Sequence, residues 1–559
     1  MINLFKKREE LIYLFILFVS SVIFVLPLFS HAGRPATFDA PFHITNIAQF
    51  SVALKNGDFP VYWENGFANY GLPIGIVAHQ VPSYLGAFFN ILLNNPTLSF
   101  NLLTFLGIAL SSLCYYRFLR IYFPPLPSFL GAFLFNFAPY RILNVYIRGA
   151  EPEVFSNIFL PLILIAIYKV INEKKYIWLF AFTIFVALLA LTHPMNLLIY
   201  SFFFGPYFVY CLWQAKQSLR EKAKEFSVFL FGGLLSLGIA AYYLIPLSVE
   251  IRYFYIGLSK NQLAPNHFLG FLNFFTERWA YETAVDKITR GQILQTGIIE
   301  TALFLVGITF LIYQIYKKKK LDLVGFAVLT GFLVLFFTLS VSNPIYQTFA
   351  FLGNIQYPWR MLNTFIFIPP IIAAFIFTKK PNIIFALLFM AAIVFLRFPQ
   401  LYGKNFTVYP DSIYYFNQKN VHSDLMSTLW MDYSQNYSVK TKQYDVIGGQ
   451  GRVTSSKIKN SSRTYIIDAK TSVQMVDYTF YFPGWKAYID GRQTTIQFQD
   501  ANYRGLIEYN VPPGRHSVML KFGDTLVRFL AKLISIVSIF SFLILLIFRT
   551  RLLAYLKKL

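Results

Sequence analysis

The chain has 559 residues, of which 56% are hydrophobic and only 13% are charged, and its mean hydropathy is +0.51. About a quarter of the residues of a soluble globular protein are charged, so the composition excludes that class and indicates an integral membrane protein. The net charge of +23 would suggest nucleic acid in a soluble protein, but the basic residues fall between apolar segments, which indicates membrane topology and no nucleic-acid partner.

Apolar runs of roughly 17–25 residues are long enough to cross a hydrocarbon core. They predict a polytopic α-helical membrane protein with about twelve spans: Leu11–Phe29, Leu98–Phe118, Leu126–Phe137, Val154–Val170, Tyr176–Leu191, Met195–Trp213, Phe226–Leu247, Ile293–Tyr316, Leu321–Leu339, Met361–Phe377, Ile383–Phe398 and Val527–Phe548. The short run Leu126–Phe137 is expected to be tilted, broken or buried among its neighbours. Pro82–Leu93 is too short to cross and is expected to be interfacial or re-entrant.

Every second connection between these spans is short and basic, as in Lys317–Lys320 after the eighth span. The N-terminal segment before the first span is basic too, with Lys6–Arg8. The positive-inside rule makes such connections cytoplasmic, which predicts a multi-pass protein of the plasma or inner membrane with both termini inside. The basic residues are also expected to contact anionic membrane lipids. The first apolar segment is too long for a signal peptide and lacks the A-x-A cleavage pattern, so it is expected to stay as the first span.

The other connections are then extracytoplasmic. We expect a membrane domain over residues 1–398, with functional outer loops at 31–80, 138–153 and 248–292. Residues 399–525 are long enough to form a domain, and residues 526–559 hold the final helix and a basic cytoplasmic tail.

The segment 399–525 has the composition of strands. TYIIDAK and SVQMVDYTFYF alternate in polarity, Asp490-Gly491 is a hairpin turn signal, and VPPGRHSVMLKF is typical of a turn followed by a strand. We expect a small β-sandwich or barrel-like domain packed on the outer face of the helices.

Asp39 and His43 lie directly beyond the first span and are four residues apart, so they share a face if this stretch is helical. A carboxylate within hydrogen-bond reach of a hydroxyl can act as a general base. The competing interpretation is a helix N-cap, because Pro41 follows closely and marks a common helix start. His43 by itself is explained as well by a polar side chain at the interface.

A second polar cluster holds Arg141, Arg148, Glu151 and Glu153 in the stretch PYRILNVYIRGAEPE. Arginine suits phosphate oxygens, and the two glutamates offer hard ligands for Mg²⁺ or Mn²⁺. The alternative is an arginine–glutamate ion pair that ties the loop to the bundle.

Two further groups lie at outer helix ends: His193 in LTHPMN and Arg360 in QYPWR. A lone histidine is more often structural than a ligand, and Arg360 can bind a lipid phosphate or simply snorkel. No nucleotide-binding or Gly-x-Ser-x-Gly motif occurs, so any reaction is expected to use a donor already in the membrane. The scarcity of ionisable residues inside the spans argues against an ion-coupled transporter.

The motifs PYRILNVYIRGAEPEVFSNIFLPLIL, LTHP, QYPWRMLN, FYFPGWKAYIDGRQ and GLIEYNVPPGRHSVMLKF occur in this order over nearly the whole chain. The chain resembles the bacterial and archaeal membrane proteins called 6-pyruvoyl-tetrahydropterin synthase-related. These are similar to the GT-C superfamily of polyprenyl-phosphate-dependent glycosyltransferases. No metal-binding histidine pattern of a pterin synthase is visible.

The resemblance implies a GT-C-like fold with an acidic residue directly after the first helix, where Asp39 stands, and a second acidic pair, which Glu151 and Glu153 match loosely. It implies a polyprenyl-phosphate sugar donor and a glycan, lipid or protein acceptor outside the cytoplasm. Asp39 would activate the acceptor hydroxyl and Arg148 would hold the phosphate, with help from Arg141 or Arg360. His43 and His193 would line the substrate site. Metal-using members favour aspartates, so the glutamates leave Mg²⁺ or Mn²⁺ open.

Two other functions stay open at this point. A lipid or polysaccharide transporter or flippase would need a polar path through the bundle. A non-enzymatic scaffold for envelope assembly would use the β-rich domain as its binding surface. The enzyme hypothesis requires Asp39, Arg148 and the Glu151/Glu153 pair to converge.

Overall fold

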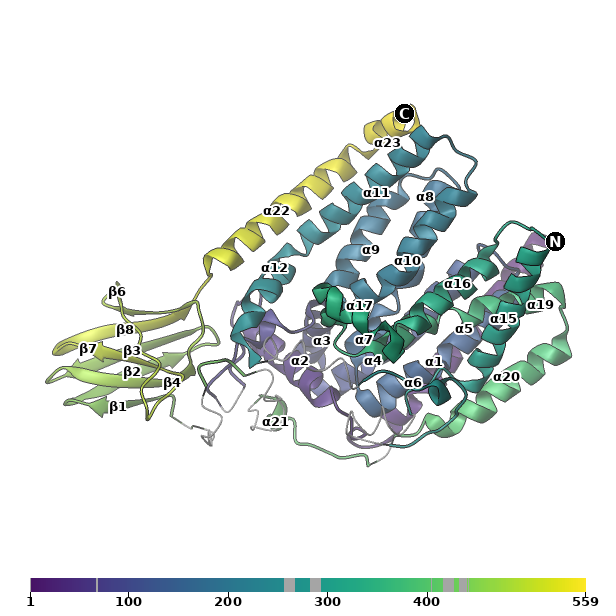
Figure 1. Ribbon diagram of the computed structural model, residues 1–559. Helices are drawn as coiled ribbons and strands as arrows, with labels where there is room; N and C mark the ends of the chain where they lie inside the picture. Colours follow the sequence, from purple (N-terminus) through teal and green to yellow (C-terminus); the bar gives the residue numbers. More distant parts are fainter. Residues whose placement is uncertain are drawn as a thin grey trace.

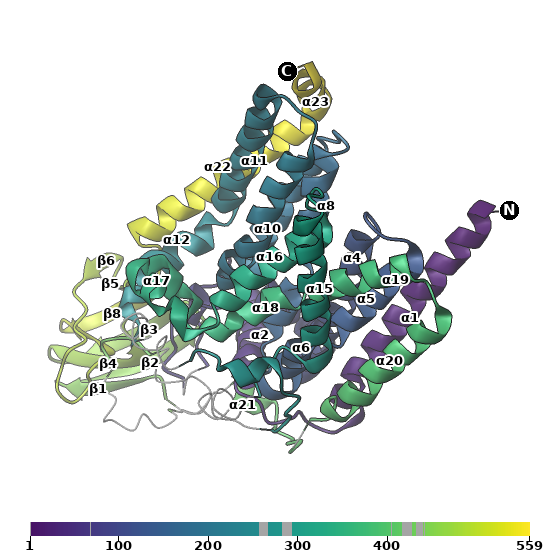
Figure 2. The same cartoon turned by 45° about the vertical axis from the view of Figure 1, so that its right-hand side comes forward.

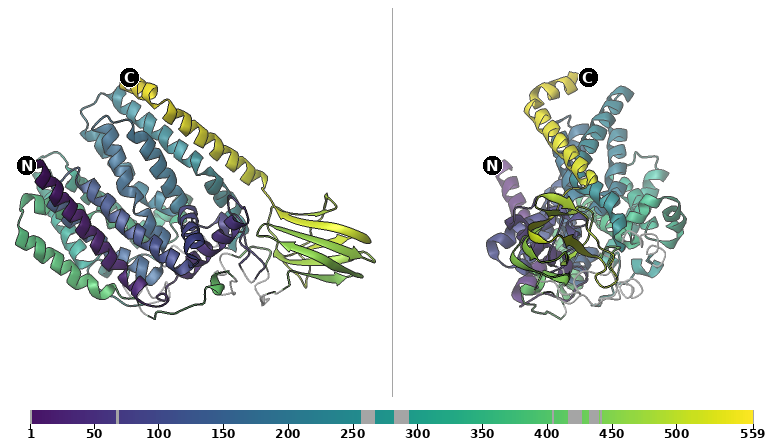
Figure 3. Two further views of the ribbon diagram at one scale, coloured as in Figure 1. Left: turned by 180° about the vertical axis from the view of Figure 1, so that it is seen from behind. Right: turned by 90° about the vertical axis from the view of Figure 1, so that its left-hand side faces the viewer.

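The chain folds into a bundle of apolar helices with a β-sheet domain inserted before the last long helix (Figure 1). The computed structural model describes residues 2–66, 69–255, 267–281, 293–403, 405–415, 427–431, 440 and 442–558. Both termini lie at one end of the bundle, and the β-sheet domain lies beyond the other end (Figures 1 and 3). The protein is therefore a polytopic α-helical membrane protein with a β-rich domain near its C-terminus.

The helices follow the apolar runs of the sequence. The first half of the chain holds α1 Ile2–Ser30, α2 Ala40–Lys55, α3 Gln80–Leu93, α4 Pro96–Leu119, α5 Pro125–Asn136, α6 Pro139–Leu143, α7 Glu151–Ser156, α8 Phe159–Ile171, α9 Trp178–Thr192, α10 Pro194–Gln214, α11 Leu219–Ile239 and α12 Ala241–Glu250. The second half holds α15 Ile298–Tyr316, α16 Leu323–Phe336, α17 Asn343–Thr348, α18 Leu362–Phe365, α19 Pro369–Lys379, α20 Ile383–Arg397, α21 Ser412–Tyr415, α22 Leu526–Ile547 and α23 Arg549–Lys558.

Each of the twelve predicted spans contains a helix, although residues 293–297 of the eighth lie before α15. In the described part of the chain, 8 helices are long and apolar enough to cross a membrane, and α9 and α16 are shorter apolar helices. The predicted span Phe226–Leu247 covers parts of α11 and α12, between which the chain bends by 71°, so this segment is a broken span or a re-entrant pair. The short run Leu126–Phe137 forms α5, which is buried among α1, α4 and α19, as one of its three predicted alternatives.

The first outer connection contains two helices that do not belong to the long spans. Helix α2 packs against α3, which contains the predicted interfacial segment, and both contact α4 (Figure 1; α2 and α4 are also labelled in Figure 2). Because α2 starts at Ala40, Asp39 stands at its N-terminal boundary and His43 one turn inside it.

The β-rich domain consists of two antiparallel sheets. Their strands are β1 Tyr444–Gly448, β2 Gly451–Ile458, β3 Ser462–Ala469, β4 Val473–Phe480, β5 Trp485–Ile489, β6 Arg492–Thr494, β7 Leu506–Val511 and β8 Gly514–Phe522. The strand orders are β1-β4-β7 and β2-β3-β8-β5-β6. Residues Ile489 and Arg492 pair across the predicted Asp490-Gly491 turn, where both turn residues have positive φ (48° and 82°).

The two sheets enclose one apolar core, which extends into the first outer connection. Trp63 from that connection packs edge-on against Trp485 of β5, with ring centroids 5.1 Å apart. Asn460 donates a 2.9 Å hydrogen bond to the Trp63 carbonyl. The β-rich domain is therefore fixed to the same segment that carries Asp39.

Candidate active site

Asp39 is positioned by backbone contacts with the second outer connection. Its amide donates a 2.7 Å hydrogen bond to the Arg148 carbonyl, and the Phe38 amide bonds the Ile147 carbonyl at 3.4 Å. Asp39 occupies the N-cap position of α2, but its side chain makes no capping hydrogen bond. The capping interpretation therefore fails to account for the carboxylate, which is directed elsewhere.

The chain around Arg148 has an unusual local structure. Residues Asn144–Arg148 form a π-helical turn, and Gly149 follows with φ +66°. A Cβ at Gly149 would lie 2.6 Å from the Ala40 Cβ, so only glycine permits this close approach to the start of α2. Turns of this kind often occur at functional sites; here the turn carries Arg148 to Asp39.

Arg148 bridges two acids at this point. Its Nη2 lies 3.4 Å from Asp39 Oδ2, and its Nη1 lies 2.8 Å from Glu153 Oε1. Arg360 Nε approaches the same Glu153 oxygen at 3.5 Å. The Arg148 and Glu153 side chains are only 6% and 2% exposed, whereas Asp39 is 41% exposed. The cluster therefore consists of a buried Arg148–Glu153 ion pair and one carboxylate, that of Asp39, which solvent can reach.

Neutral side chains also contact the buried ion pair. Tyr140 and Asn144 donate to Glu153 Oε2 at 3.1 Å and 3.4 Å. The Trp359 ring lies 5.0 Å from the Arg148 guanidinium and 5.8 Å from that of Arg360. The QYPWR motif thus contributes both a cation and the aromatic face that holds it.

Three histidines form a row beside the arginines. The rings of His43 and His79 are 5.7 Å apart, and those of His79 and His193 stack at 4.6 Å. Burial lowers the pKa of all three, that of His79 to about 4. They are therefore neutral at pH 7, and each can offer one N–H donor. His193 Nδ1 accepts the Asn196 amide at 3.1 Å, which leaves its Nε2 as the donor.

The electrostatics of Asp39 suit a base rather than a permanent anion. Burial among surrounding protein atoms raises its pKa, while the charges of Arg148 and Arg360 lower it in part. A carboxyl group with a raised pKa holds a proton more readily than a free one. The combination of access and raised pKa is typical of functional sites.

Two predicted residues are not brought into this cluster. The Arg141 guanidinium donates to the Ile108 carbonyl at 3.1 Å and the Ser111 hydroxyl at 2.8 Å, on the side of α4. The π-helical turn between Arg141 and Arg148 accounts for their separate directions. Glu151 is buried with Oε1 lacking a hydrogen-bond partner among the residues that the structure describes, and it makes none of the ion pairs above.

The acids do not fit a metal ion. Both Glu153 oxygens and one Asp39 oxygen already face arginine, tyrosine or asparagine donors. Within the described ranges, no three His, Cys, Asp or Glu side chains are grouped to hold a metal. The sequence-based hypothesis of Mg²⁺ or Mn²⁺ on Asp39, Glu151 and Glu153 therefore gains no support from the geometry.

His79 was missed by sequence reasoning. It lies in the first outer connection directly before α3, in no recognisable motif, and nothing in the sequence links it to His193 more than a hundred residues later. Only the packing of α3 beside α9 brings the two rings together.

A family model described as "6-pyruvoyl-tetrahydropterin synthase related domain; membrane protein" matches residues 80–405, more than half of the chain. The chain belongs to this family. A search of curated proteins finds no match.

Among solved structures, the chain is similar to the arabinofuranosyltransferase AftD from Mycobacteria, with a TM-score of 0.44 and 13% identity over 70% of this chain and 27% of that one. It is also similar to the oligosaccharyltransferase AglB from Archaeoglobus fulgidus, solved with an inhibitory peptide and a dolichol-phosphate. There the TM-score is 0.43 and the identity 15%, over 77% of this chain and 62% of that one. The chain thus spans less than two thirds of either structure's own length.

Proposed function

We propose that the protein is an integral-membrane glycosyltransferase that moves a sugar from a polyprenyl-phosphate donor to an extracytoplasmic glycan, lipid or protein acceptor. The observation that carries the proposal is the pairing of an accessible carboxylate, Asp39, with the buried Arg148, which shares Glu153 with the largely covered Arg360 at the end of a membrane bundle. The order of the sequence motifs supports the same reaction class. The basic connections support a plasma or inner membrane location with cytoplasmic termini.

Asp39 acts as the general base in this proposal. It accepts the proton of the acceptor hydroxyl as the oxygen attacks the anomeric carbon. The bond from that carbon to the phosphate oxygen breaks in the same step, so polyprenyl phosphate leaves and the anomeric configuration inverts. No covalent link to the enzyme forms, and the proton ends on the Asp39 carboxylate.

The leaving phosphate is held by the cationic side of the cluster. Arg148 and Arg360 have their charge balanced by Glu153 and Asp39 before the donor binds. Protonation of Asp39 during the reaction removes one of these negative charges, so the arginines interact more strongly with the phosphate as its charge develops. The neutral histidines supply N–H donors beside the arginines. In this proposal His43 and His193 keep the substrate-binding role predicted for them from the sequence.

The main competing interpretation is that the cluster is a purely structural network of ion pairs that joins α2, α7 and the QYPWR segment. A structural role explains Arg148 and Glu153, which are buried, and Arg360, whose side chain is 11% exposed. It does not require that Asp39 be 41% exposed. Transport or scaffolding would need none of these residues to touch a reacting bond.

The proposal is tested by incubating the purified full-length protein in liposomes with a panel of polyprenyl-phosphate sugars and mixed acceptors. Mass spectrometry should show release of polyprenyl phosphate from one donor class, and NMR should show an inverted anomeric centre in the product. A retained configuration would overturn the mechanism. Movement of intact labelled donor across the bilayer, without cleavage, would instead support a flippase.

A further inference from the structure

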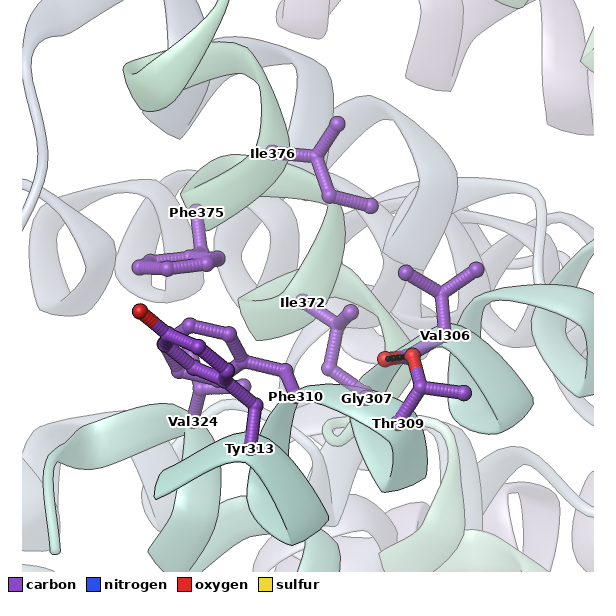
Figure 4. Close-up of a pocket in the computed structure, with 9 residues that line it drawn as sticks. All are labelled: Val306, Gly307, Thr309, Phe310, Tyr313, Val324, Ile372, Phe375 and Ile376. Carbon is purple, nitrogen blue, oxygen red and sulfur yellow. Dashed lines mark hydrogen bonds between the residues drawn. The ribbon is translucent and has the colours of Figure 1, made fainter. Parts of the chain in front are cut away.

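An apolar groove in the bundle shares no lining residue with the Asp39 cluster. It has a volume of about 290 Å³ and runs between α15, α16 and α19 (Figure 4). Its wall consists of Val306, Gly307, Thr309, Phe310, Tyr313, Val324, Ile372, Phe375 and Ile376. Val306 and Tyr313 are exposed large side chains, so the groove is open to the membrane rather than enclosed.

One end of this groove is aromatic and basic. Phe310 and Phe375 have ring centroids 4.5 Å apart, and Figure 4 shows Tyr313 on the same side of the groove. Lys319 Nζ lies 5.0 Å from the centre of the Tyr313 ring, and Lys379 Nζ lies 5.6 Å from that of Phe375. The ammonium groups of Lys319 and Lys379, which come from separate connections, therefore both lie at the aromatic end of the groove.

The surrounding charge is strongly positive. Lys317–Lys320 follow α15 and Lys380 follows α19, and all of these residues are exposed. The nearby acid Asp322 accepts the Gly325 amide at 3.0 Å as the N-cap of α16, so its carboxylate serves the helix. These connections lie at the end of the bundle that holds the N-terminus (Figure 1).

We propose that this groove binds an anionic phospholipid of the leaflet on the N-terminal side of the membrane. The phosphate headgroup lies between Lys319 and Lys379, and one acyl chain lies along Val306, Thr309 and Ile372. Basic pockets between transmembrane helices are suited to anionic headgroups. The apolar wall suits a hydrocarbon chain. A zwitterionic lipid such as phosphatidylcholine carries a choline cation that offsets its phosphate, so it balances the two ammonium groups less well than an anionic lipid does.

The headgroup is tested by native mass spectrometry of the full-length protein in detergent with dioleoyl phosphatidylglycerol or dioleoyl phosphatidylcholine. The wild type should retain phosphatidylglycerol in clear preference. The variant K319Q/K379Q should lower that retention about 25-fold, which is about 2 kcal/mol at about 1 kcal/mol per lysine. The matched control R220Q/K222Q removes the same charge from another basic connection and should retain the lipid. Equal retention of the two lipids by the wild type, or equal loss in both variants, overturns the proposal.

The groove itself is tested by filling it. Thr309→Trp places a large ring against the groove wall, whereas Ile312→Trp lies on the exposed face of the same helix and outside the groove. We expect Thr309→Trp to lower phosphatidylglycerol retention at least tenfold and Ile312→Trp to leave it unchanged. Retention that is unaffected by Thr309→Trp would place the lipid elsewhere and refute the groove as its site.

Discussion

Replacing Arg148 with methionine removes the cation that joins the two acids of the site. The pair Arg148–Glu153 is separated by 2.8 Å, and its side chains are 6% and 2% exposed, so neither charge is solvated by bulk water. Removing one partner of a buried pair costs about 3–5 kcal/mol, because the other charge stays buried. Arg360 remains 3.5 Å from Glu153 and offsets part of that cost, which places the expected loss near the lower limit of about 3 kcal/mol.

Equilibrium unfolding in mixed micelles, followed by circular dichroism, measures this loss. Glu153→Gln alone should also destabilise the protein, since it leaves Arg148 and Arg360 with less negative charge nearby. The double variant R148M/E153Q should be less destabilised than the sum of the two single variants, which is the signature of direct coupling. A loss below about 1 kcal/mol for Arg148→Met, or fully additive effects, would refute the buried ion pair.

Two further predictions concern the same site. Gly149→Ala introduces a Cβ that clashes with Ala40 at a positive φ, so it should lower stability by about 1–3 kcal/mol and reduce transfer, as measured by unfolding and by donor turnover. Desolvation by the surrounding protein atoms raises the pKa of the partly exposed Asp39 carboxyl, and the charges of Arg148 and Arg360 lower it in part. Since a base works only when deprotonated, turnover should fall as the pH drops through that pKa. Arg360→Gln should move this acid limb to higher pH in a pH–rate profile; an acid limb that shifts to lower pH, or stays in place, contradicts the assignment.

The sequence predicted the helical bundle well because apolar run length is a property of single segments. It did not predict the 71° bend between α11 and α12, because the apolar run continues through the bend. The strands of the β-rich domain were found from alternation and from the Asp490-Gly491 turn, which are also local signals. How its sheets pack on Trp63 depends on tertiary contacts that no local pattern reports.

The candidate site was predicted in part. Asp39, Arg148 and Arg360 were singled out because charged groups at apolar helix ends stand out, and the structure brings them together. Arg141 was predicted to help Arg148 hold the phosphate, yet the π-helical turn and Gly149 direct only Arg148 toward Asp39. His79 could not be found, since its place beside His193 results from packing between distant helices.

The most direct test of the central claim is the turnover of the preferred donor by Asp39→Asn in liposomes. The amide keeps the size of the side chain but cannot take the proton of the acceptor. Loss of general-base catalysis lowers rates by about 10²–10⁴-fold, and we predict a loss in this range with unchanged unfolding. The control Asp411→Asn makes the same change at an exposed position beside the segment that Gln49 of α2 contacts, and should retain full turnover. Equal turnover by Asp39→Asn and the wild type would contradict the account.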